Sequence, residues 1–225
     1  MQAILPAAGN AVRLRGLPKF LLPTESNAIT LLEKHIELLD FYVEVIWLPV
    51  RADLASLVTD LNLGEKVIPI PVRTKTMTET VLRIVELTQV TEFILGMPDT
   101  VFSKGNPYEK LISVRNSSDA DLVLSIWNTR AEQQGKVGSV KFDKNHKVLE
   151  SKDKILDKSY SHHWGAMYMN KKFIDLLNKE MPHPGYAINL AVDANLKNFV
   201  SLEEGEYYDC GTFDEYKKYL IGKTE

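Results

Sequence analysis

Short apolar runs alternate with amphipathic stretches along most of the chain. Five runs are continuous rather than alternating, which is typical of strands buried on both faces of a sheet. These runs cover residues 3–6, 44–48, 67–72, 93–96 and 121–127. Between them, apolar residues recur at helical spacing in segments 28–41, 52–62 and 78–89. Strand and helix in repeated alternation predict an α/β fold, a three-layer sandwich with a mostly parallel mixed sheet.

The pattern changes near Val137. Segments 139–142 and 147–150 flank Asp143-Lys144-Asn145-His146, a turn-like insert, and together they predict a β-hairpin. Another strand is expected around 165–169. Helices are expected near residues 171–180, 186–197 and 213–220. No internal repeat, low-complexity tract or linker breaks the sequence, so we expect one domain over residues 1–225.

Composition narrows the classes of function. The 225 residues carry a net charge of −3, which argues against a nucleic-acid footprint or a polybasic membrane patch. The single cysteine, Cys210, excludes an internal disulfide and fits a reducing compartment. No apolar run reaches the roughly 18 residues that a membrane span needs, and the segment 1–6 does not have the pattern of a signal peptide. We therefore expect a cytoplasmic protein that binds neither nucleic acid nor membrane.

A loop of small residues follows the first strand. It reads Ala7-Ala8-Gly9-Asn10, and two cations, Arg13 and Lys19, come after it. Small side chains let backbone N–H groups approach a polyphosphate, and the cations would neutralise its charge. The alternative interpretation is a tight turn with cations exposed at the surface, which would have the same residues. Two common nucleotide loops are excluded, because neither G-x-x-x-x-G-K-[ST] nor G-x-G-x-x-G is present.

Two aspartates stand at the ends of separate apolar segments. Asp99 follows the buried run 93–96 and Pro98, and the carboxyl end of a parallel strand is where open α/β sheets bind ligands. A carboxylate there suits Mg²⁺, which prefers oxygen ligands. Asp209 precedes Gly211 and Thr212, where Thr212 would cap the last helix. A turn-forming role would explain each aspartate separately.

These segments together resemble the sugar-phosphate nucleotidyltransferase family, which includes the glucose-1-phosphate thymidylyltransferases. The loop matches A-A-G-x-G-x-R-[LM] followed by P-K and L-L-P, with Ala11 in place of the second glycine. Asp99 matches the metal aspartate at a strand end, and Asp209 matches the one in W-x-D-x-G-T. The resemblance implies a Rossmann-like (GT-A-like) nucleotidyltransferase fold. It also implies a nucleotide-binding part over about 1–130 and an acceptor-binding part over about 131–225.

The resemblance further implies roles at the nucleotide. Arg13 and the loop would hold the phosphates of an NTP, and Lys19 would neutralise charge at the reacting phosphates. Asp99 and Asp209 would bind Mg²⁺, and these four side chains would form the catalytic set. The nucleobase would meet the turn between the third strand and its helix. The residues expected there are Arg73, Thr76 and Thr78, with Pro98 beside them.

Three residues are expected at the acceptor. Lys152 matches the family lysine that meets the acceptor's phosphate, and Ser151 stands where the family often has a glutamate. Gly165 matches a glycine of the later N-x-G-[IL]-Y strand, which passes close to the sugar ring.

The implied activity is Mg²⁺-dependent coupling of an NTP to a sugar 1-phosphate, with release of pyrophosphate. A cytidylyltransferase of a phosphorylated alcohol or amino-alcohol would use the same loop and metal pair. Ala11 and Ser151 are also compatible with a catalytically weak relative that only binds a nucleotide. A glycosyltransferase of similar fold is a further alternative, although the D-x-D of residues 119–121 precedes its strand and is expected to be structural. Assembly into a homo-oligomer is left open.

Overall fold

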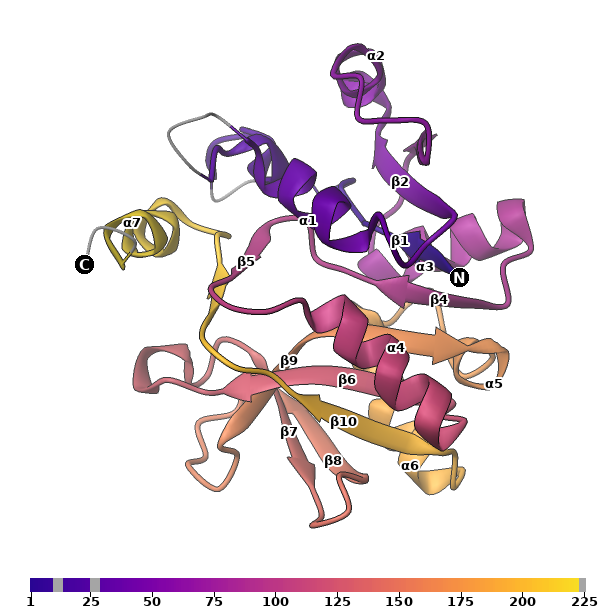
Figure 1. Cartoon of the computed structure of the whole chain (residues 1–225), viewed down its shortest axis with the longest axis vertical. Coiled ribbons are helices and arrows are strands. Elements are labelled where there is room, and N and C mark those ends of the chain that lie inside the picture. The colour runs from indigo at the N-terminus through magenta and orange to yellow at the C-terminus, as the bar shows by residue number, and fades with distance from the viewer. Residues whose placement is uncertain (10–13, 25–28, 223–225) are drawn as a thin grey trace.

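The computed structural model describes residues 1–9, 14–24 and 29–222. Its centre is a mixed sheet in which seven strands follow the order β10-β6-β9-β4-β1-β2-β3 (Figure 1). In chain order these strands are β1 (Gln2–Ile4), β2 (Val45–Arg51), β3 (Val67–Val72), β4 (Glu92–Leu95), β6 (Leu122–Asn128), β9 (His162–Asn170) and β10 (Asn198–Leu202). The expected α/β fold with a mixed, mostly parallel sheet is confirmed.

One strand of the second half of the chain lies in the middle of this sheet. Strands β3, β2, β1 and β4 are parallel, and β9 runs antiparallel to both of its neighbours, β4 and β6. The expected hairpin is present as β7 (Gly138–Phe142) and β8 (Val148–Asp153), and β7 also pairs with β9. Residues before and after position 130 therefore share one continuous sheet.

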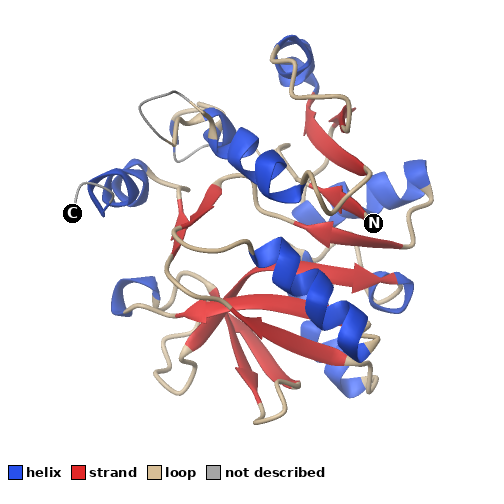
Figure 2. Ribbon diagram, viewed as in Figure 1, coloured by secondary structure: helices blue, strands red, loops and turns tan. Residues whose placement is uncertain are grey.

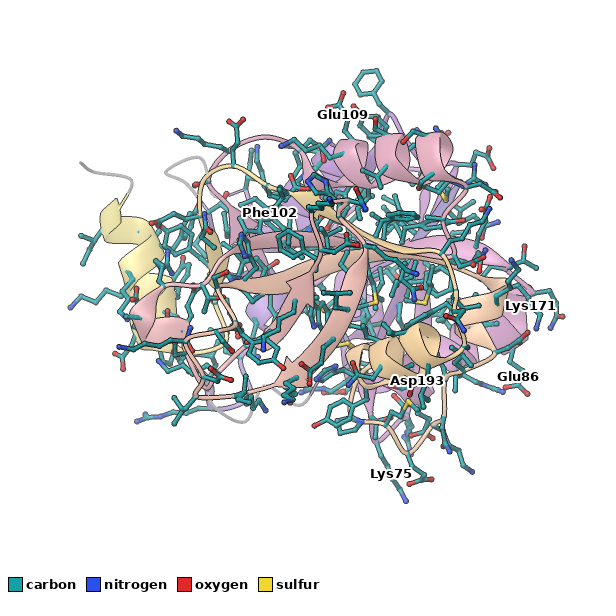
Figure 3. All side chains as sticks on the ribbon, turned by 90° about the horizontal axis from the view of Figure 1, so that it is seen from below. Lys75, Glu86, Phe102, Glu109, Lys171 and Asp193 are labelled. Carbon is teal, nitrogen blue, oxygen red and sulfur yellow. The ribbon has the colours of Figure 1, made fainter. Side chains whose placement is uncertain are left out.

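Helices cover both faces of the sheet and complete three layers (Figure 2). One core joins the sheet to α3 (Met77–Thr88), α5 (Lys171–Ile174) and α6 (Ile188–Asp193). The other joins it to α1 (Leu31–Leu39), α2 (Ala55–Asp60) and α4 (Pro107–Ser118). Strand β1 shows why its apolar run is continuous, because Ile4 enters the first core while Ala3 and Leu5 enter the second. Figure 3 shows Glu109 of α4 on the side opposite Asp193 of α6, with Phe102 between them.

Two helices of the second half are shorter than expected. The segment predicted over 171–180 is helical only to Ile174, since Leu176 and Leu177 already bond to the third carbonyl before them and Asn178 caps a following turn. The segment predicted over 186–197 begins as a 3₁₀ turn at Pro184 and becomes α6 from Ile188 to Asp193. Pro184 at the first position fixes that start.

A small two-stranded ribbon was not expected from the sequence. β5 (Thr100–Phe102) pairs antiparallel with β11 (Tyr207–Asp209), just before the last helix, α7 (Phe213–Gly222) (Figure 1). An aromatic cluster packs behind the ribbon. Phe102 stacks on Trp127 of β6 with 5.1 Å between ring centroids, and Tyr207 lies 5.2 Å from Trp127. The ribbon is thus held to the main sheet by ring packing.

Gly165 of β9 lies under this cluster. A Cβ at this position would meet the Tyr207 ring at 2.3 Å and the Trp127 ring at 2.9 Å, so glycine is required for the rings to pack. Gly9, in the loop after β1, is a natural comparison, because a Cβ there would have nothing within 4 Å.

Gly165→Ala is therefore expected to lower the free energy of unfolding by about 2 kcal/mol, because the rings must shift to admit a methyl group. Thermal unfolding followed by circular dichroism would measure the loss. Gly9→Ala should leave Tm unchanged. Equal Tm values for the two variants would show that the cluster is not tightly packed.

A buried histidine ties α1 to the start of the ribbon. His35 Nε2 lies 2.9 Å from the carbonyl oxygen of Thr100, so this nitrogen carries the proton and donates. His35 Nδ1 then accepts from the Tyr108 hydroxyl of α4. Burial lowers the pKa of His35 to about 4, although the Thr100 carbonyl and the charge of Asp99 both favour protonation.

This depressed pKa predicts a loss of stability in acid. Above pH 6.5 neutral His35 makes its full contribution to the free energy of unfolding. Between about pH 6.5 and pH 4 the unfolded chain binds a proton that native His35 does not. The free energy of unfolding therefore decreases as the pH is lowered, by about 3 kcal/mol at pH 4. Urea titrations of the wild type and His35→Gln at pH 7.5, 6, 5 and 4 would test this. The variant should be less stable at pH 7.5 and show a shallower decline; parallel curves would contradict the assignment.

Candidate active site

A cavity of about 260 Å³ lies where the parallel strands β1, β3 and β4 end. Ligands of open α/β sheets bind at this edge. Seven of the residues expected at the nucleotide or the metal line the cavity together. They are Ala7, Ala8, Gly9, Lys19, Thr76, Pro98 and Asp99. The small-residue loop and the strand-end aspartate thus lie at one site, although 90 positions of sequence separate Gly9 from Asp99.

The remaining residues expected at the nucleotide are placed differently. Asn10 and Arg13, as well as Ala11, lie outside the described residues. Arg73 is exposed and lines two neighbouring surface hollows rather than this cavity. Thr78 is fully buried in α3, and its hydroxyl has no hydrogen-bond partner among the described residues. Sequence analysis missed Thr80, one turn inside the capped start of α3, which does line the cavity.

An ion pair crosses the cavity. Lys19 Nζ lies 3.1 Å from Asp99 Oδ2, with the two side chains 17% and 31% exposed. Lys19 begins a short 3₁₀ helix, Lys19–Leu21, directly after Pro18. The pair therefore joins the loop segment after β1 to the end of β4, and it places one positive and one negative group on the cavity wall.

The ribbon brings the two predicted metal aspartates into adjacent backbone positions. Asp209 of β11 is the partner of Thr100, and the Cys210 N–H donates to the Asp99 carbonyl oxygen at 3.0 Å. Burial raises the pKa of the Cys210 thiol to about 12, and the negative charges of Asp209 and Asp99 both add to that rise.

Asp209 lines a second cavity, of about 330 Å³, rather than the cavity that Asp99 lines. Its Oδ1 accepts from the Gly211 N–H at 2.9 Å, and Thr212 accepts from the Glu215 N–H at the start of α7, as expected for a helix cap. Two lysines line this cavity with Asp209, namely Lys136 and Lys154. Neither lysine was identified from the sequence.

Lys152, the lysine expected at the acceptor, faces elsewhere. It pairs with Glu150 at 3.0 Å and lies over the Tyr160 ring. It lines neither of the two cavities described above. Side chains alternate along β8, so Ser151 and Asp153 share the face opposite Lys152. Lys154 follows the strand with a left-handed φ of 51°, and this turn directs it to the cavity of Asp209.

Ser151 borders a third cavity, of about 180 Å³, on the other side of the β7–β8 strand ends. Its hydroxyl donates to the Ser139 carbonyl oxygen at 3.0 Å. Gly165, also expected at the acceptor, lines none of the three cavities and packs against the aromatic cluster instead. Of the three residues expected at the acceptor, only Ser151 lies on a cavity wall.

The donor set suits Mg²⁺ better than a softer metal. Within the described part of the chain, no group of three or more His, Cys, Asp or Glu side chains could hold a metal ion by itself. Mg²⁺ often uses only one or two carboxylates and completes its shell with water and substrate phosphates. Asp99 and Asp209 fit that pattern. None of the described helices has the length and apolarity to cross a membrane.

No family model matches this chain, and no curated protein matches its sequence. Solved structures match it over nearly their whole length. A UDP-glucose pyrophosphorylase complexed with UDP-glucose aligns with 14% identity and a TM-score of 0.80, covering 100% of this chain and 99% of its own. The inositol-1-phosphate CTP transferase from T. maritima aligns with 18% identity and a TM-score of 0.77, covering 99% and 94%.

A third structure, from Bacillus anthracis, is assigned as a glucose-1-phosphate thymidylyltransferase and was crystallised with sucrose. It has 14% identity and a TM-score of 0.80, covering 98% of this chain and 94% of its own. At identities this low the likeness concerns the fold. The resemblance found in the sequence is confirmed at that level, and this chain has the fold of the sugar-phosphate nucleotidyltransferases.

Proposed function

We propose that this protein is a Mg²⁺-dependent nucleotidyltransferase, which couples an NTP to a sugar 1-phosphate or a similar phosphorylated acceptor. The observation that carries the proposal is the pairing of β5 with β11, which places the backbone of Asp209 opposite Thr100, the neighbour of Asp99, while Asp99 itself lines the cavity at the ends of β1, β3 and β4. The structures that share the fold include enzymes named for this chemistry with UDP-glucose and inositol 1-phosphate. A cytoplasmic location, and the division into nucleotide and acceptor parts near residue 130, belong to the same proposal.

The reaction requires positioning and charge neutralisation rather than a nucleophilic side chain. An oxygen of the acceptor's phosphate attacks the α-phosphorus of the NTP and forms a new P–O bond. The bond from the α-phosphorus to the oxygen that bridges to the β-phosphate breaks, and pyrophosphate leaves with that electron pair. The backbone of Ala7 to Gly9 would bind the phosphates and Lys19 would offset their charge. Arg13 keeps its proposed role at the phosphates.

Asp99 and Asp209 would hold the metal. When bound, Mg²⁺ would neutralise charge on the phosphates and orient them. The acceptor's phosphate would then lie in the cavity of Asp209, beside Lys136 and Lys154. Lys154 thereby takes the role that the sequence resemblance gave to Lys152.

The cytidylyltransferase alternative uses the same machinery, and the likeness to a CTP transferase of inositol 1-phosphate favours it as the second candidate. The turn between β3 and α3, which is expected to contact the nucleobase, contributes Thr74 to Met77 to the cavity wall. The D-x-D of residues 119–121 does not support the glycosyltransferase alternative. Asp121 is buried, accepts from the Lys197 N–H at 2.9 Å and pairs with Lys172, which is a structural role.

Asp99→Asn is expected to abolish Mg²⁺-dependent pyrophosphate release while the fold stays intact, because the amide cannot supply the negative charge that holds the metal. Pyrophosphate would be measured with a coupled enzyme assay over a matrix of four NTPs with glucose 1-phosphate, inositol 1-phosphate and phosphocholine. Asp209→Asn should lower the rate by about 100-fold or more.

Asp60→Asn, an exposed change on α2, serves as the control for loss of one carboxylate and should keep full activity. Tm values and circular dichroism spectra would confirm that the variants are folded. An Asp99→Asn protein with wild-type turnover would rule out this metal site. NTP binding without turnover in the wild type would instead favour the catalytically weak relative.

Lys154→Ala and Lys152→Ala form a matched pair that separates the two assignments of the acceptor lysine. Loss of Lys154 should raise the KM for the phosphorylated acceptor about tenfold, because a charge-assisted contact to phosphate is removed. Loss of Lys152 should leave KM within about twofold, since its side chain is exposed, pairs with Glu150 and does not line the cavity of Asp209. A larger rise in KM for Lys152→Ala than for Lys154→Ala would instead support Lys152 as the acceptor lysine.

A further inference from the structure

Three of the eight described residues that line the third cavity carry rings, namely Trp164, His183 and Tyr186. His183 lies between the other two rings, with centroids 5.5 Å from Trp164 and 4.8 Å from Tyr186. Asp153 is the one carboxylate on this wall within the described chain. Its Oδ2 accepts from the Tyr186 hydroxyl at 3.2 Å, and its Oδ1 lies 3.5 Å from His183 Nε2. The cavity therefore combines three π-systems with one acidic group.

The charge of the cavity is negative. No lysine or arginine is among its described lining residues. Burial lowers the pKa of His183 below its ordinary value, although the Asp153 carboxylate raises it, so the imidazole is neutral at neutral pH. Asp153 is thus the one acidic side chain on the described lining, with no basic side chain opposite it in the cavity. A ligand with a positive group would supply the missing countercharge.

The other polar groups of the cavity are engaged with one another. The Ser151 N–H donates to Asn189 Oδ1 at 2.8 Å, and Asn189 Nδ2 donates to the Ser151 carbonyl oxygen at 2.9 Å. The Ser151 hydroxyl is used by Ser139. A sugar ring needs several hydrogen-bond partners for its hydroxyl groups, whereas this wall offers mainly ring faces and one carboxylate.

Two glycines keep the Trp164 ring in place. A Cβ at Gly138 would meet its indole nitrogen at 2.3 Å, and a Cβ at Gly185 would meet the indole carbon Cζ2 at 2.4 Å. The ring is therefore closely enclosed, and only 8% of the residue is exposed. His183 Nδ1 is buried and has no hydrogen-bond partner among the described residues, so Asp153 at the other ring nitrogen is the polar contact of this imidazole.

This cavity adjoins the cavity of Asp209. Gly138 and Asp153 are paired at the ends of β7 and β8, and the next residue, Lys154, donates its N–H to the Val137 carbonyl oxygen at 3.0 Å. Asp153 faces the aromatic cavity and Lys154 faces the other one. One negative and one positive side chain thus stand on consecutive residues, in adjoining cavities.

We propose that the aromatic cavity binds a small ammonium head group of the acceptor, while its phosphate lies at Lys154. This inference rests on the proposed function, and it makes the acceptor a phosphorylated amino-alcohol rather than the phosphate of an uncharged sugar. Cations bind to aromatic faces, and a nearby carboxylate strengthens the attraction. In such a zwitterion the ammonium group would lie at Asp153 and the phosphate at Lys154, in the two adjoining cavities.

Isothermal titration calorimetry with the full chain and Mg²⁺ would test this, with phosphocholine, phosphoethanolamine and glucose 1-phosphate as separate ligands. The first two distinguish a quaternary from a primary ammonium group, and at least one of them should bind more tightly than glucose 1-phosphate. Asp153→Asn keeps an oxygen that accepts from Tyr186 but removes the charge. It should weaken binding of the ammonium ligand roughly tenfold and leave glucose 1-phosphate unchanged.

Tyr186→Ala should also weaken binding of the ammonium ligand, whereas Tyr186→Phe keeps the ring and should bind nearly as well as the wild type. Asp60→Asn controls for net charge. If glucose 1-phosphate binds and is turned over while neither ammonium ligand binds, the inference fails and the proposed function stands. If an ammonium ligand binds with the expected dependence on Asp153 but no NTP is turned over with any acceptor, the cavity assignment stands and the transferase proposal fails.

Discussion

The antiparallel pairing of β5 with β11 is the constraint on which the candidate site depends. Backbone hydrogen bonds, including the one from the Cys210 N–H to the Asp99 carbonyl oxygen, impose the approach of two acidic residues from distant parts of the chain. Lys19 pairs with Asp99 at 3.1 Å. The ribbon thus fixes the backbone of Asp209 relative to this ion pair.

The ribbon is too short to hold this geometry alone, and ring packing supplies the rest. Phe102 and Tyr207, one from each strand, both lie against Trp127 of β6. The close approach of these rings to β9 is possible because Gly165 has no side chain. A residue expected at the acceptor thereby acts on the site indirectly, since it allows the packing that holds β11, which carries Asp209, and β5, which follows Asp99.

The sequence predicted the parallel half of the sheet because its strands are buried on both faces and read as continuous apolar runs. It also predicted that Gly9, Lys19 and Asp99 would meet, since strand ends converge at one edge. β5 and β11 have only three residues each, too few for a periodic signal. Strand β8 shows a different limit. Its segment Glu150-Ser151-Lys152-Asp153 is polar throughout, so only pairing with β7 determines which side chains face the cavities.

The nucleotide cavity and the aromatic cavity are joined by one segment of backbone. The Met77 N–H at the start of α3 donates to the Pro182 carbonyl oxygen at 3.1 Å, and the Thr76 hydroxyl donates to the Lys179 carbonyl oxygen at 2.7 Å. Thr76 and Met77 line the first cavity, and His183, next to Pro182, lines the third. The start of α3 and the segment that carries His183 are therefore held to each other by hydrogen bonds, so the walls of the two cavities are parts of one connected structure.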